Sequence, residues 1–180
     1  MKTFFSVIAV VLASMCVSCA SGKFVSVQTG ADTSVTIEPT MTRIWSDCAM
    51  SPRRFKVKMY AYVPPKELAN GSAVIVMPGG SYIYMGIGRE GHAVAEFLVQ
   101  QGTAAFVLSY RTAMQWNHHP AMAQDVQRAL QLVKENAASY NINPNMVGVM
   151  GFSAGGHLAG FAAEYFDTNF MAELGVEPQC

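Results

Sequence analysis

A serine set among glycines is the part of the sequence whose residue types and spacing are best suited to chemistry. Residues 151–155 read Gly-Phe-Ser-Ala-Gly, between a β-favouring apolar run and a run rich in alanine and leucine. A strand that turns sharply into a helix would lift the Ser153 hydroxyl clear of the backbone, and Gly151 and Gly155 would let neighbouring chain segments pass close by. The N–H of Ala154 would lie at the positive end of the helix. The pattern predicts a nucleophile with half of an oxyanion hole.

A second glycine-rich turn, Pro78-Gly79-Gly80-Ser81-Tyr82, directly follows the apolar run Ala73–Met77. Consecutive glycines let main-chain N–H groups face a ligand without a Cβ in the way. We therefore expect the N–H groups of Gly80 and Ser81 to supply the other half of the oxyanion hole. Either motif taken alone also fits a plain turn between secondary-structure elements.

Apolar patterns predict alternating strands and helices that would position these two turns. A run that alternates polar and apolar residues indicates a half-buried strand, and a short continuous apolar run indicates a strand buried on both faces. Strands that alternate with helices predict an α/β fold with a mostly parallel sheet covered by helices on both faces. The expected strands are Lys56–Val63, Ala73–Met77, Ala104–Tyr110 and Val147–Met150, and the expected helices are Gly91–Gln101, one beginning at Pro120, and Ala154–Tyr165.

Composition and charge narrow the class of protein. The chain has 180 residues, of which 51% are hydrophobic, and this is enough for one globular domain with a substantial core. Its 12 basic residues are balanced by 12 acidic ones, and the basic residues gather only in a short patch at Arg53, Arg54, Lys56 and Lys58. Nucleic-acid binding needs a stronger basic surface, so we expect no nucleic-acid partner. No metal-ligand spacing occurs in the sequence, and we expect neither a metal nor another cofactor.

The first 20 residues have the pattern of a signal peptide. Lys2 precedes the uncharged apolar run Phe4–Val17, which ends in small residues up to Ala20. Spanning a bilayer takes about 20 apolar residues, so this run is short for a membrane helix. We expect the protein to be exported, either anchored to a bacterial membrane by a lipid on Cys19 or free in the periplasm or outside the cell.

Two cysteines, Cys48 and Cys180, lie beyond the signal peptide. Exported proteins can form disulfides. The spacing of these two cysteines does not decide between a bridge and two free thiols.

Four segments together resemble a known family: PGGSY, REGHAVAEFLVQQGTAAFVLSYR, HPAMAQDVQRAL and NPNMVGVMGFSAGGHLAG. They look like the α/β-hydrolase esterases of the acetyl esterase and acetyl-xylan-esterase type, which are relatives of the hormone-sensitive-lipase group. The resemblance runs from about Phe55 to Phe166. It implies an α/β-hydrolase fold and a carboxylesterase that removes short acyl groups, commonly acetyl, from carbohydrate such as xylan. The reaction would pass through an acyl-Ser153 intermediate, with the oxyanion held by the three N–H groups named above.

The sequence departs from this family in two places. Ser81 stands where the family usually has a third glycine, which keeps the backbone contact but narrows the site. The family's catalytic acid and histidine follow further strands beyond the nucleophile, whereas this sequence ends 27 residues after Ser153. We therefore expect the C-terminal strands and both triad partners to be missing from this chain.

Four other residues are candidates for supporting roles. His157 lies one helical turn beyond Ser153, and His119 with Pro120 matches a loop of the family, so we expect both histidines to lie behind the reacting groups rather than to act as the base. Tyr82 and Tyr84 follow the glycine turn and are candidates for lining an acyl or sugar pocket. Aromatic packing explains the two tyrosines equally well.

The residue patterns and the resemblance together divide the chain into a signal peptide over residues 1–20, a lead-in segment over 21–52 with a first edge strand, and the N-terminal part of an α/β-hydrolase domain over 53–180. The expected partner is a small-molecule or oligosaccharide ester, and the sequence does not indicate an oligomeric state. Two other functions also fit. A protein that has lost its chemistry could still bind acylated carbohydrate, and an exported serine peptidase of the same fold would carry the same kind of turn.

Overall fold

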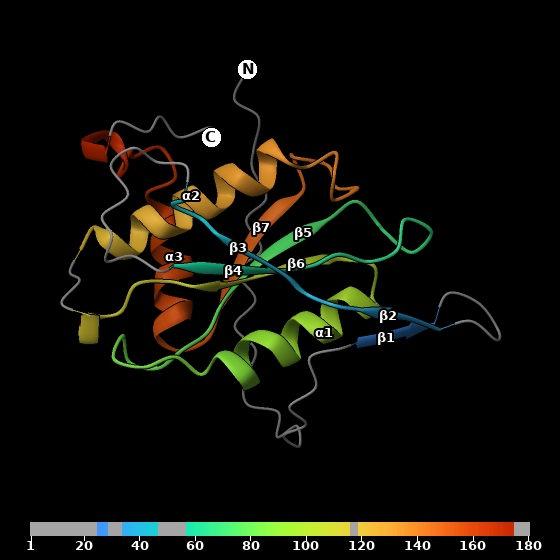
Figure 1. The fold of residues 1–180 in the computed structure, drawn as a ribbon. Helices are drawn as coiled ribbons and strands as arrows, with labels where there is room; N and C mark the ends of the chain where they lie inside the picture. Colours follow the sequence, from blue (N-terminus) through green and yellow to red (C-terminus); the bar gives the residue numbers. More distant parts are fainter. Residues whose placement is uncertain (1–24, 29–33, 47–56, 116–118, 175–180) are drawn as a thin grey trace.

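The main feature of the fold is a five-stranded mixed sheet with helices on both faces (Figure 1). The structure, a computed structural model, describes residues 25–28, 34–46, 57–115 and 119–174. The strand order in the main sheet is β3-β4-β6-β5-β7, and β1 and β2 form a separate two-stranded antiparallel sheet. The strands are β1 (Val25–Gln28), β2 (Ser34–Ile37), β3 (Thr40–Arg43), β4 (Lys58–Tyr62), β5 (Ala73–Met77), β6 (Ala104–Ser109) and β7 (Val147–Gly151).

In the described residues, three α-helices connect and follow the strands. A short π-helix, η1 (Ile87–His92), leads directly into α1 (Ala93–Gln100), and α2 (Ala121–Glu135) and α3 (Ala154–Glu164) come later in the chain. Single turns of 3-10 helix occur at Ala113–Gln115 and Ala172–Leu174. Within the described ranges, no helix is both long and apolar enough to cross a bilayer.

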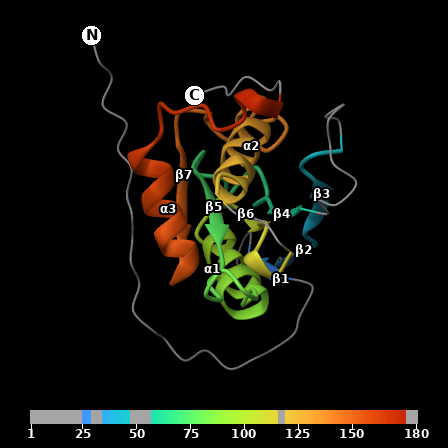
Figure 2. The same cartoon turned by 90° about the vertical axis from the view of Figure 1, so that its left-hand side faces the viewer.

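The central strands are buried on both faces, which explains their continuous apolar sequences. Successive side chains along β5 and β6 point to opposite faces, so each strand contributes to two core layers. Figures 1 and 2 show α1 on one side of the sheet and α2 on the other. The layer facing α1 contains Val76, Val107, Ala95 and Val99. The layer facing α2 and α3 contains Ile75, Phe106, Val126, Val133 and Leu158.

Strand direction brings the two glycine-rich turns together. β5 runs parallel to β6 on one side and to β7 on the other, whereas β4 is antiparallel to β6 and to β3. The carboxyl ends of β5, β6 and β7 therefore meet at one edge of the sheet. The chain leaves β5 into the turn at Pro78, leaves β6 toward Arg111, and leaves β7 toward Ser153. All three exits lie at the edge where α/β proteins usually bind ligands.

Part of the segment over residues 21–52, expected as a lead-in, belongs to the main sheet and to the core. Strand β3 is the outer strand of the main sheet, and the next residues, Ile44 and Trp45, are almost completely buried in the core. The expected helix over residues 91–101 begins earlier, as the π-helix at Ile87, and Pro120 precedes the first residue of α2 instead of being that residue. The expected signal peptide, Cys19, Cys48 and Cys180 lie outside the described residues.

Candidate active site

Ser153 occupies a sharply strained turn between β7 and α3. Its backbone has φ 47° and ψ −117°, a region that non-glycine residues rarely adopt and that costs about 1–3 kcal/mol. The residue precedes the first turn of α3, but its hydroxyl makes no capping hydrogen bond to the helix. The side chain is exposed. The turn thus holds the hydroxyl away from its own backbone, where a substrate can reach it.

The glycines on either side of Ser153 lie where any side chain would collide with backbone. A Cβ at Gly155 would overlap the carbonyl oxygens of Met77 and Pro78, at the end of β5. A Cβ at Gly151 would overlap the carbonyl oxygen of Gly155. These close approaches let the turn after β7 pack directly on the turn after β5.

The second turn passes beside Ser153. A Cβ at Gly79 would lie 2.6 Å from the carbonyl oxygen of Phe152 and 3.0 Å from Cβ of Ser153. Gly80 has φ 141° and Ser81 has φ 55°, so two successive residues have left-handed backbone. Within the described part of the chain, the N–H groups of Gly80 and Ser81 donate no hydrogen bond to the protein.

Ala154 provides the third N–H group. It is the first residue of α3, where backbone N–H groups have no partner within the helix. Among the described residues, the N–H of Ala154 donates no hydrogen bond to the protein. Free N–H groups beside an exposed hydroxyl can stabilise the negative oxygen that forms when the hydroxyl adds to a carbonyl carbon.

Several hydrogen bonds hold the turn at Pro78 to Ser81 in place. The Tyr110 hydroxyl donates to the carbonyl oxygen of Pro78 at 2.6 Å. The Gly79 N–H donates to Oε2 of Glu90 at 2.7 Å, and the Gly79 carbonyl accepts from the Gly86 N–H at 2.9 Å. The sequence alone indicates for Glu90 a surface or hydrogen-bonding carboxylate, and its partner is evident only once the fold brings η1 back onto the turn.

His157 and Tyr82 contact each other, not the Ser153 hydroxyl. The Tyr82 hydroxyl and Nδ1 of His157 are 2.8 Å apart, and the two rings meet edge to face. Burial raises the pKa of Tyr82, so the phenol keeps its proton and can donate it to Nδ1. Tyr82 also packs edge to face on Tyr110. The contact between Tyr82 and His157 therefore ties the glycine turn to α3. The side chain of Tyr84, two residues further along the chain, is 67% exposed.

His119 belongs to an aromatic cluster. Its ring lies 5.4 Å from that of Phe161 and 5.5 Å from that of Phe170, edge to face in both cases. Its described ring contacts are to these aromatic residues, and none is to the turn at Ser153. The described contacts of His119 therefore do not join it to Ser153.

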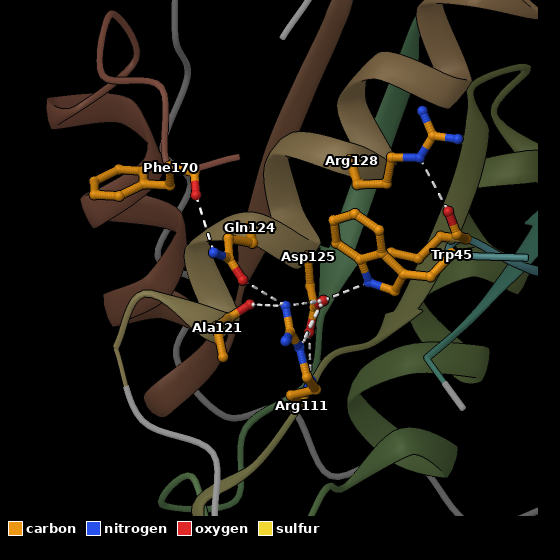
Figure 3. A network of polar contacts seen from close by, with 8 residues as sticks. Trp45, Arg111, Ala121, Gln124, Asp125, Arg128 and Phe170 are labelled. Atoms are coloured by element: carbon orange, nitrogen blue, oxygen red, sulfur yellow. Dashed lines mark hydrogen bonds and ion pairs between the residues drawn. The ribbon is translucent and has the colours of Figure 1, made fainter. Parts of the chain in front are cut away.

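A buried ion pair lies behind the same edge of the sheet (Figure 3). Arg111 follows β6 and Asp125 lies on α2, and their side chains are 4% and 0% exposed. Nε of Arg111 donates to both carboxylate oxygens at 2.9 and 3.0 Å, and Nε1 of Trp45 donates to Oδ1 at 2.8 Å. Burial raises the pKa of Asp125, and Arg111 opposes that rise by stabilising the carboxylate.

This ion pair also binds neighbouring segments together. Nη2 of Arg111 donates to the carbonyl oxygen of Ala121 and to Oε1 of Gln124, and Gln124 donates to the carbonyl oxygen of Phe170. Sequence reasoning treated Asp125 as a surface or hydrogen-bonding carboxylate. Its position on the apolar stripe of α2, three residues after Met122 and four before Ala129, is the signal that indicates burial. The network stabilises the exit from β6, and its described hydrogen bonds do not include Ser153.

No metal centre is evident in the ranges that the structure describes, since no three His, Cys, Asp or Glu side chains are grouped there to hold an ion.

The fold and the site together define an α/β-hydrolase, with parallel strands that end in a serine turn and a glycine turn. The model of the BD-FAE family matches residues 59–175, which is more than half of the chain. The protein is a member of the BD-FAE family.

Named relatives of this chain act on esters and on xylan. It is 38% identical over 104 residues to an acetylxylan esterase of Xylanibacter ruminicola, a match covering 58% of this chain and 21% of the relative. It is 36% identical over 115 residues to endo-1,4-beta-xylanase B of Butyrivibrio fibrisolvens, covering 63% and 18%. The crystal structure of an acetyl ester-xyloside bifunctional hydrolase from Caldicellulosiruptor lactoaceticus matches with a TM-score of 0.58 and 36% identity, covering 67% of this chain and 44% of that one.

The chain thus spans about a fifth of the curated relatives and less than half of the solved structure.

Proposed function

We propose that this chain carries the nucleophile and the oxyanion hole of a serine carboxylic-ester hydrolase that removes acetyl groups from acetylated xylan or similar carbohydrate. The observation that carries the proposal is the exposed Ser153 hydroxyl in a strained turn, packed against a second turn with free N–H groups. The named relatives supply the substrate class, because they are an acetylxylan esterase and an acetyl ester-xyloside hydrolase.

The proposed reaction has two halves. The Ser153 hydroxyl adds to the ester carbonyl carbon, and the carbonyl oxygen becomes an oxyanion that accepts hydrogen bonds from the N–H groups of Gly80, Ser81 and Ala154. The C–O bond to the sugar then breaks, the sugar hydroxyl leaves with a proton, and an acetyl-Ser153 ester remains. Water adds to this ester in the second half and releases acetate.

Efficient attack also needs a general base for the hydroxyl proton. Nδ1 of His157 is bonded to Tyr82 and His119 packs in an aromatic cluster, and the hydrogen bonds of the described residues include none between either histidine and Ser153. We propose that the base comes from residues outside the described part of the chain or from a longer form of the protein.

A second candidate function rests on the same observation. Without a base bonded to Ser153, the chain could bind acetylated oligosaccharide at this site without turning it over. A serine peptidase of the same fold is a third candidate, and an acetyl amide tested beside an acetyl ester separates it from the esterase.

Hydrolysis of a chromogenic acetyl ester by the purified chain tests the proposal. Ser153→Ala is compared with Ser139→Ala, a control at an exposed serine after α2. We expect Ser139→Ala to match the wild type and Ser153→Ala to lose at least about 10³-fold in rate. If the wild type turns over the ester and both variants do so at the same rate, the role of Ser153 is refuted. A folded wild type that binds acetylated xylo-oligosaccharide without turnover would favour the binding protein.

We also propose that the protein is exported through its N-terminal segment, with Cys19 as a candidate lipid attachment site. The support is the sequence pattern of residues 1–20. The mass of the mature protein tests it, because a chain beginning at acylated Cys19 or just after Ala20 differs from one that retains Met1. Retention of Met1 in the mature protein would contradict export by this route.

A further inference from the structure

We infer that Glu90 is a positioning residue that fixes the direction of the oxyanion-hole N–H groups. This inference rests on the proposed function, since it assigns a role within the same site. Glu90 lies on η1, which follows the glycine turn by only a few residues and folds back onto it. Its carboxylate accepts a hydrogen bond from the Gly79 N–H. It acts on the backbone of Gly79.

The first step is the bond between Glu90 and the turn. Oε2 of Glu90 accepts the Gly79 N–H at 2.7 Å in a partly buried setting. A hydrogen bond from a backbone N–H to a carboxylate is shorter and about twice as strong as one between neutral groups. The carboxylate also packs tightly here, because a Cβ at Gly79 would lie 2.9 Å from Oε2 and 3.0 Å from Cβ of Ser153.

The second step is the planarity of the peptide unit. The Pro78 carbonyl and the Gly79 N–H belong to one plane, and this plane is held at one end by Tyr110 and at the other by Glu90. The Gly79 carbonyl and the Gly80 N–H belong to the next plane. That carbonyl accepts from the Gly86 N–H, so the Gly80 N–H must point the opposite way.

Glu90 also supports this second plane through its own backbone. The Glu90 N–H donates to the Gly86 carbonyl oxygen at 2.9 Å, which keeps Gly86 beneath the turn. The two peptide planes that lead to the Gly80 N–H are therefore fixed, the first by Tyr110 and Glu90 and the second by Gly86. The Gly79 N–H is consumed in this arrangement, and the N–H groups of Gly80 and Ser81 remain for the oxyanion.

The role needs a hydrogen-bond acceptor and not a negative charge. A carboxylate near a developing oxyanion repels it, so charge alone would work against the reaction. Glutamine offers an amide oxygen of similar reach. We therefore expect Glu90→Gln to preserve the turn and Glu90→Ala to release it.

Two measurements on the full chain test this role: ¹H–¹⁵N NMR spectra of the turn, and binding of benzeneboronic acid, which forms a tetrahedral adduct with a reactive serine. The control is Glu67→Ala, at an exposed glutamate with no described hydrogen bond. We expect Glu90→Ala to shift the amide signals of Gly79, Gly80 and Ser81 and to bind the boronic acid roughly 10- to 100-fold more weakly. Glu90→Gln and Glu67→Ala should stay within about 3-fold of the wild type, less than the loss of one oxyanion donor.

Folded Glu90→Ala that binds the boronic acid as tightly as the wild type would overturn the inference. Glu90→Gln as weak as Glu90→Ala would also overturn it, because the acceptor alone would then be insufficient. If the wild type forms no adduct, the proposed function fails for this chain and the amide signals decide about Glu90. Unchanged Gly80 and Ser81 signals in Glu90→Ala would then refute the positioning, and shifted signals restored in Glu90→Gln would support it.

Discussion

The close packing of the two turns can be tested with a pair of glycine substitutions on one helix. Gly155 and Gly160 both lie on α3. An added Cβ at Gly160 would meet nothing within 4 Å, whereas at Gly155 it would overlap the backbone carbonyl groups of Met77 and Pro78. Gly155→Ala and Gly160→Ala therefore change the same residue type in the same helix and differ in the space available.

The expected magnitudes follow from two opposing effects. Replacing glycine by alanine within a helix stabilises it by about 1 kcal/mol, and this applies to both variants. At Gly155, β5 and α3 must move apart, and overpacking of this kind costs about 1–3 kcal/mol or more when backbone must shift. We expect Gly160→Ala to be slightly more stable than the wild type and Gly155→Ala to be about 3 kcal/mol less stable than Gly160→Ala.

Urea unfolding followed by circular dichroism measures the two free energies of unfolding. For a chain of this size, a difference of about 3 kcal/mol corresponds to melting temperatures roughly 6–12 °C apart. The readout does not depend on catalysis. If Gly155→Ala unfolds at the same urea concentration as Gly160→Ala, the two turns do not pack as closely as described here, and the geometry of the oxyanion hole loses its basis.

Two further predictions concern buried polar groups. Asp125→Ala removes the carboxylate that Arg111 binds in the core, and we expect the free energy of unfolding in urea to fall by about 3–5 kcal/mol; a change below 1 kcal/mol would contradict the network. Burial raises the pKa of Tyr62 to about 12, so the folded protein holds this proton more tightly than the unfolded chain does. The contribution of the protonated Tyr62 hydroxyl to the free energy of unfolding should be fully present below pH 10 and should be lost as the pH rises from 10 to 12. In Tyr62→Phe, the free energy of unfolding should fall less steeply across this pH range than in the wild type. An identical slope in the two proteins would exclude Tyr62 as a cause.

The central strands and both turns could be predicted because their physical signals are local. Residues 73–77 are apolar throughout because β5 is buried on both faces, and β5 has the predicted bounds. The strand and helix around Ser153 were predicted within one residue. The glycines of the two turns are required by contacts between segments, but each lies in a short motif that is recognisable without knowing those contacts.

The remaining features depend on contacts between distant residues. All four side chains of β3 are exposed, so this strand has no apolar pattern, and its place in the sheet comes from backbone pairing with β4. Trp45 and Asp125 are 80 residues apart and meet only in the folded core. Glu90 meets Gly79 because η1 folds back on the turn. No local pattern contains these pairings.

The backbone angles of Ser153 favour glycine over serine at this position. Glycine adopts φ near 47° with little strain, so a turn that served only to join β7 to α3 would be more stable with glycine there than with serine. The serine hydroxyl makes no capping hydrogen bond to α3, and the backbone bond from the His157 N–H to the Ser153 carbonyl would also form with glycine. The protein is therefore less stable at this residue than the fold requires. A stability screen that ignored function would replace the hydroxyl first, which is the relation expected where stability and activity oppose each other.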